Sequence, residues 1–204
     1  KELNYKAEFI ETDTNNNFYL ADIDTLSIFN WQLDIQNYGN SWALLNAPDW
    51  MTLSTKHNRL YLGYSSGRIT YFDIKQGKDA IETHFATLAK AVTGLKAMGD
   101  YLFAVDSTGS QYQHYSLNIN GEILDSKQWR NSSPEYIWNK HNDYLYQLVS
   151  NRIKGSQLYS INGIFSDNSI TSPYANNTTM DHPLRLNSDG TLLINGSGQI
   201  FNAD

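Results

Sequence analysis

A short pattern of alternating apolar and polar residues returns along this chain at a nearly constant interval. Its clearest copy is residues 58–73, where Leu60 and Leu62 alternate with their neighbours as in a half-buried β-strand. Gly67 follows in a turn, because glycine adopts the positive φ that other residues avoid. A second strand, rich in β-branched and aromatic residues, begins near Ile69. This copy therefore predicts a β-hairpin.

The first strand of this hairpin occurs five times in the chain. The matching segments are residues 18–20, 60–62, 102–104, 145–147 and 192–194, at intervals of 42, 42, 43 and 47 residues. A polar turn precedes each segment, and a second turn is predicted at residues 65–67, 107–109, 154–155 and 196–198. Further short strands flank each hairpin, which makes four antiparallel strands in each period of about 40 residues. This combination is typical of a β-propeller blade.

With this hairpin in each repeat, the chain resembles β-propeller repeat proteins, most closely those with pyrroloquinoline-quinone-type and kelch-like repeats. In those families a Leu-Tyr-Leu strand, a Ser-x-Gly turn and an aromatic strand ending near Asp, as in residues 58–73, recur from blade to blade. The resemblance implies an all-β fold, a β-propeller or propeller-like array of about five four-stranded antiparallel blades. It implies no activity.

The repeat count leaves the closure of the array open. Four units are complete, and the fifth, residues 184–204, ends after its third strand. Residues 1–5 could supply the missing outer strand, because an open sheet edge favours association with another strand. We expect residues 1–204 to form a single propeller-like domain or to be a fragment of a longer chain.

Residues 79–98 favour a different structure when they are taken alone. Apolar residues such as Phe85 and Leu88 have the spacing of an amphipathic helix. The repeat instead requires an outer strand near residues 81–88 and an inner strand near residues 93–97. Because tertiary context routinely overrides local propensity, we predict the two strands.

The composition excludes several classes of protein. The 15 Lys and Arg residues against 21 Asp and Glu residues give a net charge of −6, so we predict no nucleic-acid partner. The chain contains no cysteine, which rules out disulfides, thiolate catalysis and cysteine-ligated metals. No apolar run approaches the roughly 18 residues that span a bilayer, so we predict no membrane insertion. The acidic, polar, Asn- and Tyr-rich composition predicts an exported bacterial protein of the periplasm or the cell surface.

Polar clusters that could be taken for metal sites are better explained as turns. Residues 13–17 offer alternating oxygen atoms, but the glycine that an EF-hand loop needs at its sixth position is Phe18. Asx-rich turns between strands are common. His57 and His141 occupy the same turn in two repeats. We therefore predict no metal site, no cofactor and no catalytic residue.

The residues best suited to ligand binding are aromatic and charged side chains near the segments that link one repeat to the next. Loops on a rigid scaffold carry function, and indole and guanidinium groups make good contact surfaces for proteins and carbohydrates. Asp181 and His182 lie in the longest irregular segment, residues 171–183. The predicted ligand-binding residues are Trp50, Arg68, Asp106, Trp129, Arg130, Arg152, Asp181 and His182.

The sequence therefore predicts a non-catalytic module that binds a protein or carbohydrate ligand through loops at one end of the array, or that acts as a scaffold. A first alternative is a lyase or hydrolase with its acid, base and cation on those loops, at Asp49, Asp106, Arg130, Arg152 and His182. A second alternative is a structural spacer of a larger surface protein, which self-associates through strand edges at residues 1–5 and near Asp204.

Overall fold

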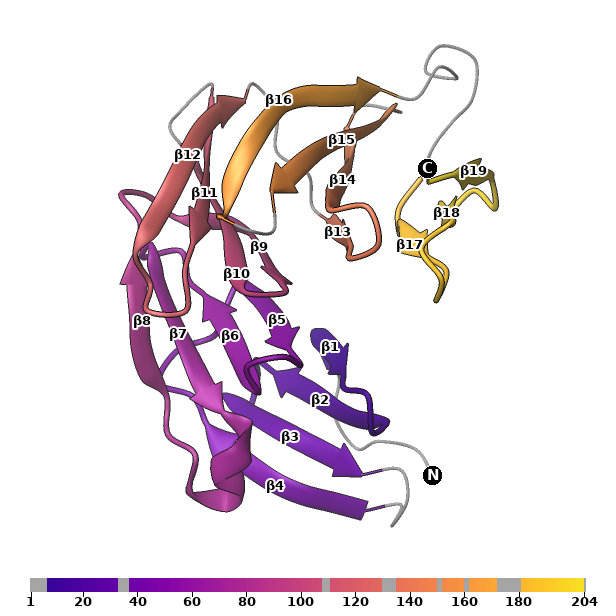
Figure 1. Cartoon of the computed structure of the whole chain (residues 1–204). Helices are drawn as coiled ribbons and strands as arrows, with labels where there is room; N and C mark the ends of the chain where they lie inside the picture. Colours follow the sequence, from indigo (N-terminus) through magenta and orange to yellow (C-terminus); the bar gives the residue numbers. More distant parts are fainter. Residues whose placement is uncertain are drawn as a thin grey trace. The chain divides into compact units, whose positions relative to one another are not determined.

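The computed structural model divides into two compact units, Lys1–Val92 (unit 1) and Thr93–Asp204 (unit 2). The structure describes residues 7–32, 37–107, 111–129, 135–149, 152–159, 162–171 and 181–203. The described elements are β-strands and one 3-10 helix (Figure 1), so the all-β prediction is confirmed. That residues 1–204 form one domain stays a prediction.

Unit 1 contains two four-stranded antiparallel sheets whose strands follow one another in sequence order (Figure 1). The strands of the first sheet are β1 (Phe9–Thr12), β2 (Asn17–Asp22), β3 (Ser27–Gln32) and β4 (Asn37–Ala43). Those of the second are β5 (Trp50–Ser54), β6 (Arg59–Gly63), β7 (Arg68–Asp73) and β8 (Thr83–Thr87). A 3-10 helix, η1 (Ile74–Asp79), connects β7 to β8. Short connections of this kind join antiparallel neighbours.

Unit 2 contains three sheets, also with their strands in sequence order. The first consists of β9 (Val92–Met98, which begins at the last residue of unit 1), β10 (Tyr101–Ser107), β11 (Tyr112–Leu117) and β12 (Ile123–Trp129). The second consists of β13 (Tyr136–Asn139), β14 (Tyr144–Val149), β15 (Arg152–Tyr159) and β16 (Ile164–Thr171). The third has β17 (Arg185–Leu186), β18 (Leu192–Ile194) and β19 (Ile200–Asn202).

The repeat in the sequence corresponds to the succession of sheets. Residues 18, 60, 102, 145 and 192 all lie in the second strands of their sheets. Among the described residues there are four four-stranded blades, however, so the prediction of about five was wrong. The fifth sheet has only three strands among the described residues. Residues 1–5 and Asp204, which are predicted to form strand edges, lie outside the described residues.

In the second strand of the fifth sheet, the residue that faces the preceding sheet comes one position later than the sequence repeat predicts. In the fourth sheet, Leu145 packs against the preceding sheet in a cluster with Phe103. In the fifth sheet, the residue that packs against the preceding sheet, in a cluster with Tyr146, is Leu193. Because side chains alternate between the faces of a strand, Leu192 then points to the opposite face, where it is 38% exposed. The predicted match of Leu192 to the buried repeat position was therefore wrong.

The two strands predicted within residues 79–98 are confirmed as β8 and β9. The competing helix does not form over residues 80–98, and η1 ends at Asp79. The turn predicted at residues 154–155 was wrong, because both residues lie inside β15. Gly155 pairs there with Tyr146 of β14. A glycine inside a strand leaves room beside a large partner, so this glycine does not mark a turn.

Trp42 of β4 joins the two sheets of unit 1. Its indole ring stacks on Tyr19 and Phe72, with ring centroids 6.2 and 5.5 Å away. The indole N–H donates a hydrogen bond of 2.8 Å to the backbone carbonyl of Gly77 in η1. A buried tryptophan with a satisfied N–H stabilises strongly, so this one side chain fixes both the packing of the sheets and the position of η1.

Aromatic rings also fill the space between the first two sheets of unit 2. The ring centroid of Phe103 in β10 lies 4.9 Å from that of Tyr136 in β13. His114 of β11 is buried in the same cluster, with its ring centroid 4.2 Å from that of Trp129. Its Nδ1 lies 3.1 Å from the backbone carbonyl oxygen of Tyr112. A titratable ring is therefore held inside an aromatic core.

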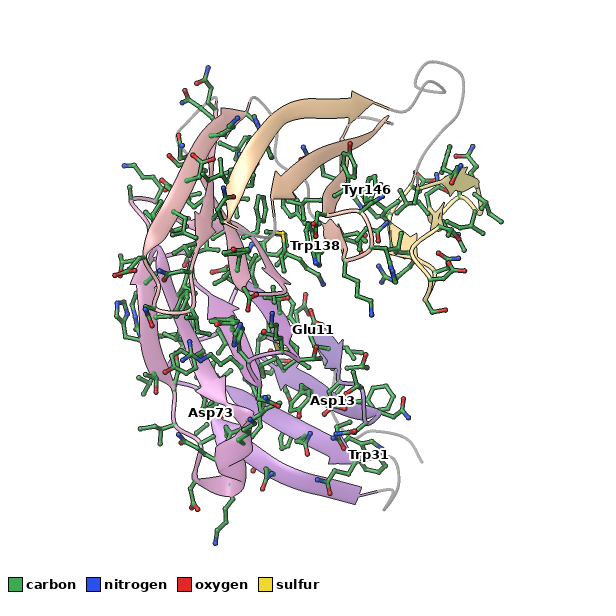
Figure 2. All side chains as sticks on the ribbon, viewed as in Figure 1. Glu11, Asp13, Trp31, Asp73, Trp138 and Tyr146 are labelled. Carbon is green, nitrogen blue, oxygen red and sulfur yellow. The ribbon has the colours of Figure 1, made fainter. Side chains whose placement is uncertain are left out.

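Tyr146 of β14, labelled in Figure 2, attaches the three-stranded sheet to the fourth blade. Its hydroxyl group donates a hydrogen bond of 2.5 Å to the backbone carbonyl of Ala203. The side-chain amide of Asn142 donates to the same carbonyl at 2.8 Å. Leu184 and Leu193 complete the apolar contact around the Tyr146 ring. The last described residues of the chain are thus anchored by a single phenol and its neighbours.

A Tyr146→Phe substitution is expected to lower the stability of the three-stranded sheet by about 1–2 kcal/mol, because a buried carbonyl loses one of its two donors. Hydrogen exchange of peptides from residues 184–203 measures this change. The matched control is Tyr144→Phe, since the Tyr144 hydroxyl makes no hydrogen bond to the described residues. Equal protection in both variants would contradict the anchoring role of Tyr146.

Candidate functional site

The described candidate residues lie at one end of their own sheets. The strands of each sheet are antiparallel and follow one another in sequence order. The first and third strands therefore begin at the same end of the sheet at which the second and fourth strands end. The chain passes to the next sheet from this end. We call this the linker end of a sheet. The candidates found there are Trp50 and Arg68 in unit 1, and Asp106, Trp129, Arg152, Asp181 and His182 in unit 2. Arg130 lies outside the described residues, and for Arg152 only the backbone is described.

Two of these candidates contact the core of unit 2. Asp106 is 0% exposed, and its carboxylate accepts a hydrogen bond of 3.1 Å from the hydroxyl group of Tyr115. Burial, with the nearby charge of Asp106, raises the pKa of Tyr115 to about 12. Trp129 packs between His114 and Phe165, with ring centroids 4.2 and 5.6 Å away. Asp106 is therefore buried in the scaffold, while Trp129 packs against the core and stays partly exposed.

Arg68 of unit 1 is held beside a buried carboxylate. Its Nη2 atom lies 4.0 Å from Oε1 of Glu82, whose side chain is 7% exposed. The same oxygen accepts hydrogen bonds from the hydroxyl groups of Tyr64 at 2.7 Å and Thr70 at 2.9 Å. Burial, followed by the hydrogen bond and the charge of Glu82, raises the pKa of Tyr64 above its ordinary range. The position of the Arg68 guanidinium group is thus fixed beside Glu82. Trp50, the other candidate of unit 1, is the first residue of β5 and is only partly exposed.

Charged side chains converge at the linker end of unit 2. Oε1 of Glu135, just before β13, accepts a hydrogen bond from the guanidinium group of Arg185 in β17. Oε2 of Glu135 accepts a hydrogen bond of 2.6 Å from the backbone N–H of Leu184 and lies 3.4 Å from Nδ1 of His182. One carboxylate therefore holds the segment that enters the three-stranded sheet.

The turn between β18 and β19 holds the same segment. The Ser197 hydroxyl group donates to the carboxylate of Asp181 at 3.1 Å and accepts from its backbone N–H at 3.0 Å. The Gly196 N–H donates to the Asp181 carbonyl at 2.7 Å. A Cβ atom on residue 196 would lie 2.0 Å from the carbonyl oxygen of His182, so only glycine allows this close approach. We call Glu135, Asp181, His182, Arg185 and Ser197 the unit 2 linker cluster.

Unit 1 contains a related contact. The carboxylate of Asp49, directly before β5, accepts a hydrogen bond from the backbone N–H of Ser65 in the turn between β6 and β7. The two members of each pair, Asp49 with Ser65 and Asp181 with Ser197, are 16 residues apart. The sequence analysis did not identify either serine as a site residue, although the repeated interval of 16 residues could have indicated both contacts. Glu135 was also missed, because no sequence pattern connects it with Arg185.

The unit 2 linker cluster presents fixed polar groups to solvent. The side chains of Arg185, His182 and Glu135 are 62%, 39% and 22% exposed. Exposed ion pairs stabilise a fold by only about 0–1 kcal/mol, so the main consequence of the cluster is the surface that it forms. That surface offers guanidinium donors, an imidazole and carboxylate acceptors in one place, which suits hydrogen bonding to a polar ligand.

The polar turn at residues 13–17 is explained by its own hydrogen bonds. The carboxylate of Asp13, labelled in Figure 2, accepts from the backbone N–H groups of Asn15 at 2.8 Å and Asn17 at 2.9 Å. This confirms the Asx-turn interpretation. In the described part of the chain, no three His, Cys, Asp or Glu side chains are grouped so that they could hold a metal ion. No helix among the described residues is long and apolar enough to cross a membrane.

The successive four-stranded sheets give the chain a β-propeller-type fold, and solved structures agree. The fold is similar to the WD40 domain of Toxoplasma gondii coronin, with a TM-score of 0.64 and 12% identity over 85% of this chain and 47% of that chain. For the β-propeller domain of Myceliophteria thermophila Cps50 (Swd1) the TM-score is 0.61, with 11% identity over 95% of this chain and 62% of that chain. A chain of the mitotic checkpoint complex gives 0.60 and 12% identity, over 100% of this chain and 79% of that chain. Identities this low show the fold alone.

Sequence comparisons are less informative. No protein-family model matches the chain. The chain is 26% identical to lymphocyte antigen 75 of Mesocricetus auratus over 168 residues, which cover 79% of this chain but 8% of that protein. This chain thus spans a small fraction of that relative, and less than two thirds of the Cps50 and coronin chains. The resemblance to pyrroloquinoline-quinone-type and kelch-like repeats stays a prediction.

Proposed function

We propose that the protein is a non-catalytic binding or scaffold module, and that its unit 2 linker cluster contacts a protein partner. The fold supports this proposal, because a β-propeller mounts many loops on a rigid frame, and loops on a rigid frame often carry binding residues. The observation that carries it is the convergence of three separate segments, which contribute Glu135, residues 181–185 and Ser197, on one exposed polar surface.

The geometry of the cluster favours binding because its groups are fixed before a partner arrives. Glu135 holds Arg185 and His182, and Ser197 holds Asp181, so less side-chain freedom is lost on binding. Arginine is enriched among the residues that contribute most to protein interfaces. Both signs of charge are present, so we expect a polar partner with mixed charges, either a protein or a carbohydrate-bearing protein.

An Arg185→Ala substitution is expected to weaken partner binding about tenfold, because the exposed guanidinium group would contact the partner directly. Partners are identified by chemical cross-linking of the purified chain in an extract of its source cells, followed by mass spectrometry. The affinity of the identified partner is then measured by biolayer interferometry.

The matched control for this experiment is Lys140→Ala. Lys140 is an exposed cation of unit 2 that follows β13 directly, at the end of its sheet opposite the linker end. We expect this variant to bind like the wild type. Equal affinities for Arg185→Ala and the wild type, or equal losses in both variants, would remove the linker cluster from the binding surface.

We also propose that the protein is exported from a bacterial cell and acts in the periplasm or at the cell surface. The acidic, polar, Asn- and Tyr-rich composition supports this proposal. Fractionation of the source cells, followed by detection with an antibody, is expected to find the protein outside the cytoplasm. Recovery with a cytoplasmic marker would contradict it.

A further inference from the structure

The dipeptide Asn-Gly occurs three times in unit 2, each time in the connection between two strands (Figure 1). The pairs are Asn120-Gly121 between β11 and β12, Asn162-Gly163 between β15 and β16, and Asn195-Gly196 between β18 and β19. Asn-Gly is favoured in turns for conformational reasons. Because glycine has no Cβ atom, it also leaves the asparagine side chain open to attack by the next backbone nitrogen. The three pairs therefore share one possible reaction.

This reaction is the spontaneous deamidation of asparagine. The backbone nitrogen of the glycine loses its proton to hydroxide and attacks Cγ of the asparagine. A C–N bond forms, the Cγ–Nδ2 bond breaks, and ammonia leaves after it takes a proton from water, which closes a succinimide ring. Water then opens the ring at one carbonyl or the other, to give aspartate or isoaspartate. The reacting atoms belong to neighbouring residues, so the step needs only a mobile side-chain amide and an accessible glycine nitrogen.

The structure blocks this reaction at Asn195, which is 3% exposed. Its Oδ1 atom accepts a hydrogen bond of 2.9 Å from the backbone N–H of Gln199, and its Nδ2 atom donates to Oε1 of Gln199 at 2.8 Å. The N–H of Gly196 donates to the backbone carbonyl of Asp181 at 2.7 Å. Both reacting groups are therefore held apart by hydrogen bonds away from solvent.

The structure hinders the reaction at Asn162. Asn162 is exposed, but its Oδ1 atom accepts a hydrogen bond of 3.2 Å from the backbone N–H of Ile164. Gly163 is buried, and a Cβ atom on it would lie 2.6 Å from Cδ1 of Leu124 and 2.9 Å from the ring of Tyr101. This packing fixes the backbone of Gly163 and limits the access of hydroxide to its nitrogen.

The turn at Asn120 is more open. Asn120 is exposed, and its side-chain amide makes no hydrogen bond to another described residue. Asn118 braces both sides of the turn, because its Oδ1 atom accepts from the backbone N–H groups of Asn120 at 2.9 Å and Glu122 at 3.0 Å. The partly exposed Gly121 donates its N–H to the Asn118 carbonyl at 3.0 Å, and a single hydrogen bond in an exposed turn opens at low free-energy cost.

We propose that Asn120 is a site of spontaneous deamidation in the folded protein, and that the turn structures direct the reaction to it in preference to Asn162 and Asn195. The product adds one negative charge to a chain whose net charge is −6. Isoaspartate also lengthens the backbone by one carbon atom in the turn that leads into β12. The start of this strand is therefore altered as the protein ages.

The test is incubation of the folded chain in oxygen-18 water at pH 8, followed by digestion at acidic pH and mass spectrometry of the peptides. We expect Asn120 to be converted at least fivefold faster than Asn162 and at least tenfold faster than Asn195. Each product should contain one oxygen-18 atom in the new carboxylate. Isoaspartate should be present, because only the succinimide ring gives it, whereas direct hydrolysis of the amide gives aspartate alone. Absence of isoaspartate, or faster conversion of Asn162 or Asn195, would overturn the proposal.

Two controls separate the turn structure from the local sequence. In urea, where the turns are lost, the three pairs should react at similar rates. The same order of rates in urea and in the folded chain would assign the preference to sequence and contradict the proposal.

The second control is Gly121→Ala, which should slow conversion of Asn120 at least tenfold, because a Cβ atom obstructs the attacking nitrogen. Its matched variant is Gly99→Ala, in the turn between β9 and β10. Gly99 also has a positive φ, of +58°, and nothing lies within 4 Å of its Cβ position, so the rate at Asn120 should not change. Equal rates in the two variants would rule out attack by the nitrogen of residue 121.

Discussion

Between pH 7 and pH 4, the wild-type protein is expected to lose about 3 kcal/mol more unfolding free energy than a His114→Phe variant. His114 is 0% exposed in the aromatic core of unit 2, and burial lowers its pKa from 6.5 to about 4. Below pH 6.5 the unfolded chain binds a proton that the folded chain does not bind. Stability therefore falls as the pH decreases from 6.5 to 4, and the loss caused by this residue levels off below pH 4.

Hydrogen exchange in denaturant, measured at several pH values, provides the test. Peptides from β10 and β11 should show the difference between wild type and His114→Phe, while peptides from β5 and β6 in unit 1 serve as an internal reference. Every other titratable group is the same in both proteins, so its effect cancels in the comparison. A His114→Gln variant checks that the result depends on titration and not on ring size. The same pH dependence in all three proteins would mean that His114 is not held neutral by burial.

A Gly67→Ala substitution is expected to destabilise unit 1 by about 3 kcal/mol. Gly67 has a φ of +84°, a conformation in which a residue with a side chain is strained. An added Cβ atom would also lie 2.6 Å from the carbonyl oxygen of Leu88 and 2.8 Å from that of Lys90. Both oxygens belong to the backbone of the segment that links β8 to β9, so this segment would have to move.

Two glycines of the chain isolate these effects. Gly198 occupies the corresponding turn of the three-stranded sheet with a φ of +77°, but nothing lies within 4 Å of its Cβ position. Gly77 of unit 1 has a φ of +57° and only the side-chain amide of Asn40 at 4.0 Å. We expect Gly198→Ala and Gly77→Ala to cost only about 1–2 kcal/mol each. Thermal and urea unfolding measure all three variants. If Gly67→Ala loses no more stability than Gly198→Ala and Gly77→Ala, the contact between residue 67 and the linking segment is unimportant.

Most of the strands could be predicted from local patterns. The period of the repeat placed β8 and β9 correctly in residues 79–98, even though apolar spacing alone favoured a helix. The errors arose where one residue type is compatible with two different structures. Gly155 is a strand residue opposite Tyr146, because glycine permits both a turn and a close neighbour.

The candidate site was only partly predictable. Proximity to linking segments identified Asp181 and His182, which the structure brings together with Glu135 and Arg185. The same criterion identified Asp106, which is buried inside unit 2, and Trp129, which is partly buried against its core. Position along a strand says which end of a sheet a residue occupies. It does not say whether the next sheet covers that residue.

The sequence by itself determined the repeating hairpins, their turn glycines and the all-β class, because alternation and turn chemistry act between residues that are near neighbours in the chain. Only the tertiary structure decided that Leu193 and not Leu192 faces the fourth blade, and that Glu135 meets a segment almost 50 residues away. Both facts depend on how one sheet stacks on another. A one-residue shift reverses every side chain of a strand while leaving its alternating pattern unchanged.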